Sequence, residues 1–496
     1  MTKKITSSIQ DHKRQVVPRL LPVSTNSLQT SLPRQRLLEF FNSRVRVFDL
    51  HPNSEMALEV LNASLLCEVQ DHASVNRAIQ ILKESDHSER WDLLFIAAKH
   101  SGQIDYPSLM GTDPRKEISV LRRRLKLYPK DPLRWIQLGY WQTVVGNNSG
   151  AEKSYTVAMQ LGADHPFVAR SASRFFLHSG DDDRAAKAIR TPTNWRSDPW
   201  LLAADIAIRD VVGKPTEGIK RGLEYLEAGT FAPQYSSELA AAIATIHWRD
   251  GEARKARQML RAAAQDPTEN ANAQVEYLNP RLESAVVTPS KQPQFNFEAS
   301  SRRFFREKEF ESSLAAADRW LNFQPFSCSA LVWTSYLHST VLNQHAKAID
   351  LIYKHIRAVG REPILLNNLA FYHSQIGEYD RAAPLLAELE SHLGEEPVVL
   401  ATKGNYLIRT GHVEAGKSLY AEAIAQFKSK GVRREELMAR FHRLEALAAV
   451  EDAELLDSMD EIAKASDDLK LHELSFRIEQ GLLRIGTKKV TDPKKP

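Results

Sequence analysis

The chain has 496 residues, 43% of them hydrophobic and 26% charged, with a formal net charge of +4 at pH 7. This balance is typical of a folded protein, and so small a net charge does not by itself predict nucleic-acid binding. No apolar run approaches the roughly 18–20 residues of a membrane-spanning helix. Cys67 and Cys328 form no CxxC motif, which argues against a disulfide framework and a thiolate zinc site and fits a reducing compartment.

The first 32 residues are polar, contain scattered prolines and show no sustained period, so we expect residues 1–32 to be a disordered arm. The arm is basic, because residues 1–48 contain nine Lys or Arg and only two Asp or Glu. Its apolar stretch at residues 16–21 is interrupted by Pro18 and Arg19 and does not form a secretory signal. We therefore expect a cytoplasmic protein, with a mitochondrial transit peptide as the alternative.

Amphipathic helices are predicted from Leu37 onward, where apolar residues recur at spacings of three and four. The helices up to Leu127 show this spacing without a regular repeat, which is typical of divergent or capping units. Beyond them a fixed period begins: Gly146 and Gly180 are 34 residues apart, and the prolines at 132 and 166 keep the same separation. A period of this length predicts a solenoid of helix hairpins.

The unit at 132–165 shows what each hairpin requires. Large side chains fill the space around the helix crossing, a small residue at 139 lets the helices approach closely, and Gly146 permits the turn between them. Its pattern resembles the tetratricopeptide repeat (TPR) at Trp135, Leu138, Gly139, Gly146, Ala151, Tyr155 and Ala158. The resemblance implies a right-handed all-α superhelix. It extends over most of residues 87–430 and is specific for fold, not for function.

A polar, proline-containing stretch divides the repeats. Residues 268–297 show no helical period and are predicted to be a linker between an N-terminal array at 33–267 and a C-terminal array at 298–486. In the second array the period returns with Gly377 and Gly411, again 34 residues apart. Residues 487–496 are predicted to be a disordered tail.

The sequence Gly411-His412-Val413-Glu414-Ala415-Gly416-Lys417-Ser418 matches the phosphate-binding pattern GxxxxGK[ST]. A true phosphate-binding loop follows a buried strand, whereas Gly411 is the turn glycine of a helical repeat, and Glu414 would repel phosphate. We interpret the match as a repeat turn and keep an NTPase as a minor alternative.

Candidate recognition residues lie on the first helix of a repeat, the face that lines the groove in TPR proteins. The groove candidates are Tyr140, Phe167, Arg170, Arg174, Phe371 and Asn405. Aromatic and cationic side chains together predict an acidic and hydrophobic peptide or helix as the ligand of the first four. Some TPR proteins clamp a carboxyl terminus with Lys and Asn, but Ala401 stands where the clamp's lysine would accompany Asn405.

These features predict a non-enzymatic scaffold or adaptor that binds a segment of a protein partner in a concave groove. Sixteen histidines show no HExxH motif or paired ligand spacing, so no metal, cofactor or catalytic residue is predicted. Two alternatives remain: a regulatory sensor that responds to a peptide or small ligand, and a nucleic-acid binder that uses the basic arm and residues 122–126.

Overall fold

The structure is a computed structural model that describes residues 14–20, most of 34–84, 113–282 except Tyr128, 287–450 except three positions, and part of 465–478. Every regular element in these residues is helical, which confirms the predicted all-α helical-repeat solenoid. The chain divides into two compact units: Gln15–Phe295 forms the N-terminal unit, and Asn296–Pro496 together with Met1–Arg14 forms the C-terminal unit.

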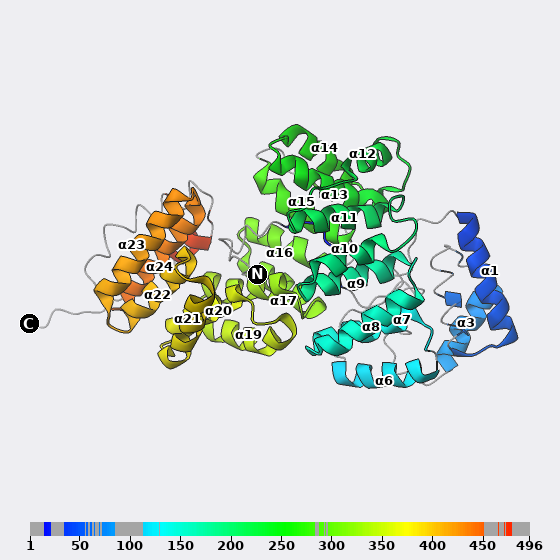
Figure 1. Ribbon diagram of the computed structural model, residues 1–496, viewed down its shortest axis with the longest axis horizontal. Helices are drawn as coiled ribbons and strands as arrows, with labels where there is room; N and C mark the ends of the chain where they lie inside the picture. Colours follow the sequence, from blue (N-terminus) through cyan, green and yellow to red (C-terminus); the bar gives the residue numbers. More distant parts are fainter. Residues whose placement is uncertain are drawn as a thin grey trace, which may run out of the picture. The chain divides into compact units, whose positions relative to one another are not determined.

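The N-terminal unit contains packed helix hairpins, which Figure 1 shows in sequence order from α6 to α15. Its strongest pairs are α7 with α8, α9 with α10 and α13 with α14. The helices are α1 (Arg34–Leu50), α3 (Ala73–Glu84), α6 (Pro114–Leu127), α7 (Pro132–Val144), α8 (Asn148–Leu161), α9 (Pro166–His178), α10 (Asp182–Arg190), α11 (Pro199–Val211), α12 (Ile219–Glu227), α13 (Pro233–Arg249), α14 (Ala253–Ala263) and α15 (Glu269–Leu278).

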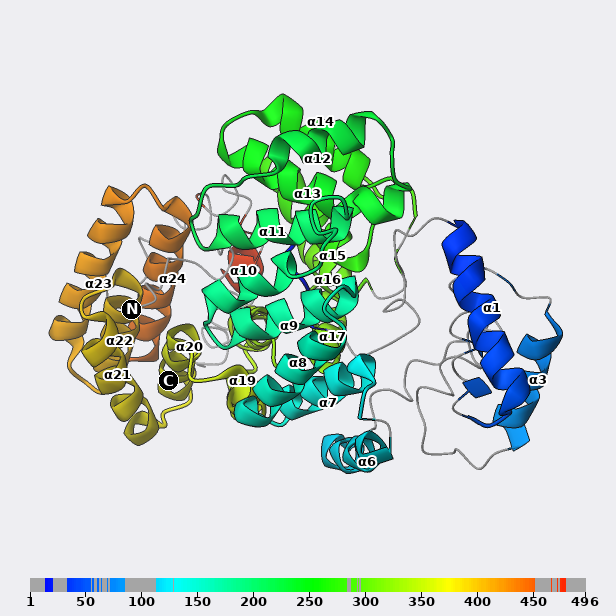
Figure 2. The ribbon, with the colours of Figure 1, turned by 45° about the vertical axis from the view of Figure 1, so that its right-hand side comes forward.

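The C-terminal unit repeats the arrangement, and the views of Figures 1 and 2 both place α22, α23 and α24 side by side. Arg14, assigned to this unit, donates from Nε to Oε1 of Glu298 at 2.9 Å. The helices are α16 (Phe297–Arg306), α17 (Phe310–Phe323), α18 (Cys328–Tyr336), the π-helix η3 (Leu337–Val341), α19 (His345–Val359), α20 (Pro363–Gln375), α21 (Tyr379–Leu393), α22 (Pro397–Arg409), α23 (Val413–Ser429) and α24 (Arg433–Ala449).

The hairpin of α7 and α8 shows how the sequence specifies one repeat. Asp131 caps α7, accepting hydrogen bonds from the backbone N–H groups of Leu133 and Arg134 at 3.0 and 3.2 Å. A Cβ added at Gly139 would lie 2.8 Å from the ring of Tyr155, so the two helices approach too closely for a larger residue there. Tyr155 itself is fully buried and stacks on Phe175 of the next hairpin at 4.8 Å between ring centroids. Each hairpin thus completes its core with its neighbour.

Residues 14–20 differ from the predicted disordered arm. They form no helix, but Val16 and Leu20 are 0% and 1% exposed, and Val16 belongs to the apolar core formed by α11 and α13. The remaining residues of the predicted arm lie outside the described residues. Since the described part is non-helical, the helical period that revealed the repeats could not reveal it.

The predicted linker also differs, because residues 269–278 form helix α15. Thr268 caps the helix by accepting a hydrogen bond from the backbone N–H of Ala271 at 3.1 Å. Ala271, Val275 and Leu278 give α15 a short apolar face that packs into the N-terminal core. The rest of its buried surface is polar, with Asn272 and Gln274 at most 1% exposed, and this polar composition concealed the helix.

Candidate functional site

The inner side of the C-terminal unit contains a cavity of about 150 Å³ between α20, α22 and α24. Most of the surface that faces it is apolar. Its walls are contributed by Tyr336, Thr340, Ile364, Asn367, Asn368, Phe371, Tyr372, Val398, Ala401, Thr402, Tyr420, Phe427, Arg434, Glu435, Met438, Ala439 and His442. A cavity of about this size in a protein core holds one benzene-sized group, so it fits one large side chain of a partner.

Aromatic rings give the cavity its shape. The rings of Phe371 on α20 and His442 on α24 meet edge to face with centroids 4.7 Å apart, which fixes the side of the cavity between these helices. Tyr372 and Tyr420 are 2% and 1% exposed, and burial raises the pKa of both phenols. Both phenols therefore remain neutral at physiological pH, so this part of the wall carries no charge.

Five buried polar atoms of the lining have no hydrogen-bond partner among the described residues: Oδ1 of Asn367, Nδ2 of Asn368, the Tyr420 hydroxyl, Nε of Arg434 and Oε1 of Glu435. The two asparagines, the tyrosine and the glutamate are at most 8% exposed. Polar atoms buried in this way are costly unless a partner or water satisfies them. One amide offers an acceptor and the other a donor, which together match the N–H and C=O groups of a peptide backbone.

Beside the amides, Arg434 of α24 is held in a buried ion pair. It donates hydrogen bonds to Glu473 and to the Tyr336 hydroxyl, which in turn lies 3.1 Å from Oε1 of the same glutamate. Burial, followed by the nearby Glu473 charge, raises the pKa of the Tyr336 phenol. Because this cation is already neutralised within the unit, Arg434 does not require an acidic ligand.

The predicted residues of the C-terminal array lie in different environments. Phe371 lines the cavity, as does Asn367 beside it. Asn405 is 0% exposed, and its Oδ1 accepts a hydrogen bond from Nε of Arg409 at 3.2 Å, so its side chain does not present a free surface to a partner. The position of Asn405 in its repeat indicated the inner helix correctly but did not reveal how deeply the side chain is buried.

In the N-terminal unit, Arg170 differs from the expectation that it attracts an acidic ligand. Nη2 of Arg170 pairs with Oε2 of Glu238 at 2.6 Å, and Nη1 donates to the Trp200 carbonyl at 3.2 Å. Tyr140 is 4% exposed, and burial raises the pKa of its phenol. Phe167 and Arg174 are half-buried. The cation of Arg170 thus serves the interior of the unit, and the predicted preference for acidic peptides loses its main support.

The segment that matches the phosphate-binding pattern spans the turn from α22 to α23, as the repeat interpretation predicts. Gly411 has φ +91° in that turn, and Gly416 lies where the two helices cross. A Cβ at Gly416 would lie 2.7 Å from the Gly404 carbonyl oxygen, so close helix packing accounts for this glycine without a phosphate. The described part of the chain places no β-strand before the turn.

Sequence reasoning missed most of the cavity's lining. Met438 and His442 come from α24, which lies beyond the last clear 34-residue unit, and Asn368 lies on α20 at a position that the repeat pattern does not mark. One available signal was the pair Asn367-Asn368 within an otherwise apolar helix, since amides in such a run need partners. The π-helix η3, which contributes Thr340, carried no sequence signal that we recognise.

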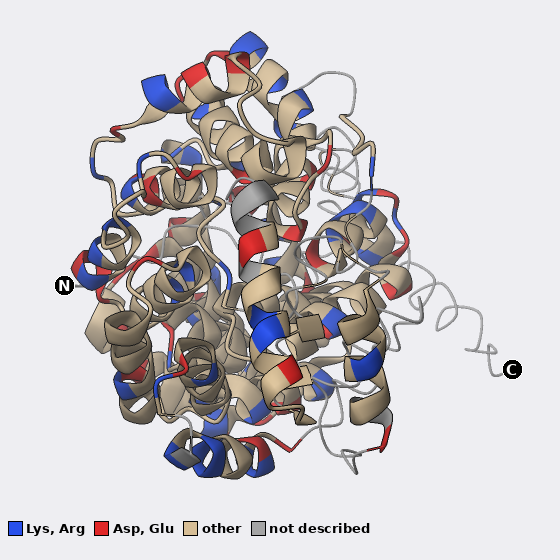
Figure 3. Cartoon of the chain, turned by 90° about the vertical axis from the view of Figure 1, so that its right-hand side faces the viewer, with Lys and Arg blue, Asp and Glu red and all other residues tan. Residues whose placement is uncertain are grey.

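Further functional classes receive no positive support in the described residues. No group of three or more His, Cys, Asp or Glu that could hold a metal ion occurs there. None of the described helices is long and apolar enough to cross a bilayer. In the view of Figure 3, acidic and basic residues are interspersed over the helices.

Comparisons with known proteins find matches among solved structures only. No family model and no curated protein matches the chain. Solved structures that match include an APC/C heterotetramer, Cut9–Hcn1, at 13% identity and a TM-score of 0.36, covering 90% of this chain and 88% of that chain. The human IFIT1 dimer with m7Gppp-AAAA matches at 13% identity and a TM-score of 0.32 (84% and 99%), and Naa15/Naa10 bound to HypK-THB at 14% and 0.24 (92% and 72%).

Proposed function

We propose that the chain is a non-enzymatic scaffold whose C-terminal unit binds a segment of a protein partner in the cavity lined by Phe371. The observation that carries this proposal is the combination of an apolar cavity with buried, unpartnered amide atoms at Asn367 and Asn368. The apolar walls contact one large hydrophobic side chain of the partner, and the two amides form hydrogen bonds with the partner's backbone on either side of that side chain.

The expected ligand is a peptide or helix with a hydrophobic anchor. A cavity of about 150 Å³ admits one leucine- or phenylalanine-sized group. Interfaces commonly concentrate binding energy in such an anchor. Since Arg434 is already paired with Glu473, an acidic ligand would gain little there.

The test fills the cavity without disturbing the fold. Ala401 lies on its wall and is half-buried, so we expect Ala401→Phe to occupy the space of the partner's anchor. Ala425, exposed on α23 outside the lining, provides the matched control Ala425→Phe. The tagged wild-type chain and both variants are used to capture partners from the native host, with and without nuclease, and the retained proteins are quantified by mass spectrometry.

We expect a protein retained by the wild type and by Ala425→Phe to fall at least tenfold with Ala401→Phe, whether or not nuclease is present. Photo-crosslinking from position 438, on the cavity wall, should then join the same protein to the chain. Equal capture by all three chains would contradict the cavity as the binding site. Loss of all partners after nuclease would favour the nucleic-acid alternative instead.

A further inference from the structure

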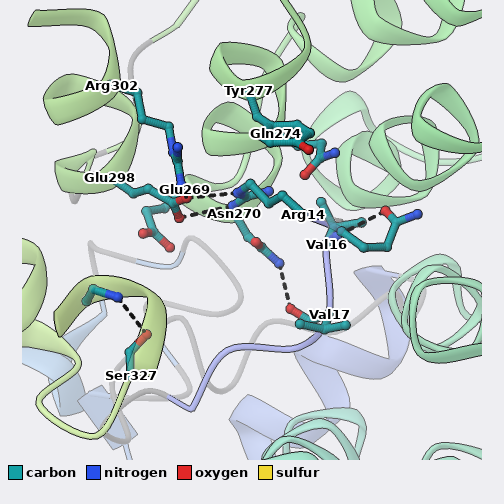
Figure 4. Close-up of polar contacts among 12 residues, drawn as sticks. Arg14, Val16, Val17, Glu269, Asn270, Gln274, Tyr277, Glu298, Arg302 and Ser327 are labelled. Carbon is teal, nitrogen blue, oxygen red and sulfur yellow. Dashed lines mark hydrogen bonds and ion pairs between the residues drawn. The ribbon is translucent and has the colours of Figure 1, made fainter. Parts of the chain in front are cut away.

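The inner side of the N-terminal unit is covered by a short piece of the chain's own N-terminus, residues 15–20, called here the cis segment. Its backbone forms no helix, and the side chains it contacts come from the first helices of successive hairpins, α11 and α13, and from α15. The sequence predicted partner recognition in this unit on other first helices, α7 and α9, so this surface was not among the predicted ones. Figure 4 shows the cis segment passing Asn270 with Val16 and Val17 on it.

Apolar contacts hold the two valines. Val16 is 0% exposed and belongs to a cluster with Leu202 and Ile206 of α11 and Leu239 and Ile243 of α13. Val17 packs against the same cluster from its edge. Two adjacent β-branched residues are therefore recognised by shape and burial, and a charged residue at the position of Val16 would have to be desolvated without a partner.

Polar contacts recognise the segment on both sides of the valines. Nε2 of Gln15 donates to Oδ2 of Asp210 at 3.1 Å and to the Ala242 carbonyl at 3.4 Å. Nδ2 of Asn270 donates to the Val17 carbonyl at 3.0 Å, and Figure 4 marks this bond. The side-chain amide of Asn270 thus binds the backbone of the cis segment directly, as side chains do when a protein binds a separate peptide.

Arg19 is the charged residue of the cis segment, and it forms an ion pair with α15. Its Nη1 pairs with Oε1 of Glu269 at 2.6 Å and its Nε donates to Oδ1 of Asn270 at 3.2 Å, with the arginine side chain 9% and the glutamate 14% exposed. Asp210, which accepts from Gln15, is itself paired with Arg249, so Glu269 is the carboxylate that neutralises Arg19. The surface is therefore complementary to a basic residue at the position of Arg19, whereas the sequence predicted an acidic ligand for the surface that includes Arg170 and Arg174.

We propose that this surface is a recognition site for a non-helical segment of another protein that carries two adjacent β-branched residues followed, two positions later, by arginine, and that the cis segment occupies it as an intramolecular competitor. All the contacts described above are made by the side chains and backbone of one short stretch, so the same stretch of a separate chain can make them. An occupant that belongs to the same chain competes at a high effective concentration, because it stays near the site when it leaves it. A partner must therefore bind tightly enough to compete with the cis segment at this effective concentration, and weak ligands are excluded from the site.

The test releases the cis segment and supplies its sequence as a separate molecule. In the full-length chain, Val16→Asp with Arg19→Glu places a charge in the apolar cluster and a like charge beside Glu269. A fluorescent peptide of residues 13–22 is titrated into this variant and into the wild type, with anisotropy as the readout. We expect the peptide to bind the variant at least tenfold more tightly than the wild type, and circular dichroism to show that helix content is kept.

A charge exchange makes the test specific for the site. Glu269→Lys, added to a chain released by Val16→Asp alone, should weaken the wild-type peptide at least tenfold and restore binding of the peptide carrying Arg19→Glu. If the double variant does not fold, Arg19→Glu alone serves, because Val16 is then left in place and only the ion pair is lost. Absence of peptide binding to a folded, released chain would overturn the proposal and show that the segment is a permanent part of the unit.

A second copy of the chain is the alternative source of the occupant. Dimerisation of the released variant that is reversed by the peptide would assign the site to exchange between copies and overturn the proposed partner. The experiment does not depend on the C-terminal cavity, because it uses no residue of that lining. A failed capture through the cavity and a failed peptide titration therefore report on separate proposals.

Discussion

The inner surfaces of the two units differ in how completely the chain satisfies them. In the N-terminal unit, Gln15 and Arg19 of the cis segment meet Asp210, Asn270 and Glu269 at hydrogen-bonding distance. In the C-terminal unit, the amides of the cavity lining retain atoms without a partner in the described residues. Similar helix hairpins thus produce one surface whose polar groups are paired within the chain and another that retains unpaired ones among the described residues, so repeat architecture alone does not tell whether a groove is available.

The chemistry of the two surfaces explains the difference. Carboxylates such as Glu238 and Glu269 are too costly to bury alone, and each is paired with an arginine of the same unit. Burying a neutral amide without a hydrogen-bond partner, as at Asn367 and Asn368, costs much less free energy than burying an unpaired charge. The comparison therefore predicts that polar substitutions reduce stability in the N-terminal unit and reduce binding in the C-terminal unit.

The largest effect is expected from Arg170→Ala, which leaves Glu238, 4% exposed, without its counter-ion. We expect the N-terminal unit to lose about 3 kcal/mol or more of stability. Chemical denaturation, with hydrogen exchange to locate the loss in α9 and α13, measures it. Adding Glu238→Gln should recover part of the loss because the buried charge is removed. A loss below about 1 kcal/mol for Arg170→Ala would show that the ion pair is not essential and weaken the comparison.

The next effect concerns the crossing of α22 and α23, which supports Tyr420 and Phe427 on the cavity wall. At Gly416 a Cβ would lie 2.6 Å from Cγ1 of Ile408 and 2.9 Å from its backbone nitrogen. Gly416→Val should therefore cost the C-terminal unit about 3 kcal/mol and distort the cavity. Thermal unfolding compares it with Ala425→Val on the exposed face of the same helix. A melting temperature matching that of the control would contradict the close crossing.

The sequence could predict the hairpins because their constraints are local and periodic. The small residue at 139 opposite Tyr155, and the prolines that begin α7, α9, α20 and α22, are specified within single repeats. The cis segment and α15 could not be recognised in the same way. Val16 has its partners on α11 and α13, nearly two hundred residues or more away in sequence, and α15 buries amides where a period search counts apolar residues.

The candidate site was predictable only at the level of the helix face. Phe371 was identified because its position in the repeat points inward, and it does line the cavity. The same rule selected Asn405, which is fully buried against Arg409 and Gln375. Inward position in a repeat therefore does not separate a residue that lines a surface from one that packs beneath it, because that depends on the side chains of neighbouring helices.

A smaller effect is expected from pH, again in the C-terminal unit. Burial, opposed by the Glu445 charge, lowers the pKa of His345 to about 4, with Arg477, Arg409 and His442 acting in the same direction as burial. His345 accepts or donates at Nδ1 to the hydroxyl of Ser339 in η3, 2.7 Å away. In the unfolded chain this histidine takes up a proton near pH 6.5, whereas in the folded chain it resists protonation until about pH 4.

Its contribution to stability is therefore complete above pH 6.5 and is lost as the pH falls toward 4, by about 2 kcal/mol once partial exposure is considered. Denaturation at pH 7, 5.5 and 4.5, with hydrogen exchange assigned to η3 and α19, measures the loss. His345→Gln, which can keep a hydrogen bond and does not titrate, should flatten this part of the profile. An unchanged profile in that variant would show that another group controls the acid response.

The smallest effect on stability is expected at Lys417, in the segment that matches the phosphate-binding pattern. A phosphate site there would give the C-terminal unit a second kind of ligand and alter its comparison with the N-terminal unit. Nζ of Lys417 lies 3.3 Å from Oε1 of Glu414, whose side chain is 88% exposed, and such a pair contributes little. Lys417→Met keeps most of the apolar stem and removes the charge, so stability should change by about 0.5 kcal/mol or less. Calorimetry with magnesium ATP should give the same result for the variant and the wild type. Nucleotide binding by the wild type that Lys417→Met abolishes would reverse the assignment, because a repeat turn has no use for that cation, whereas a phosphate loop depends on it.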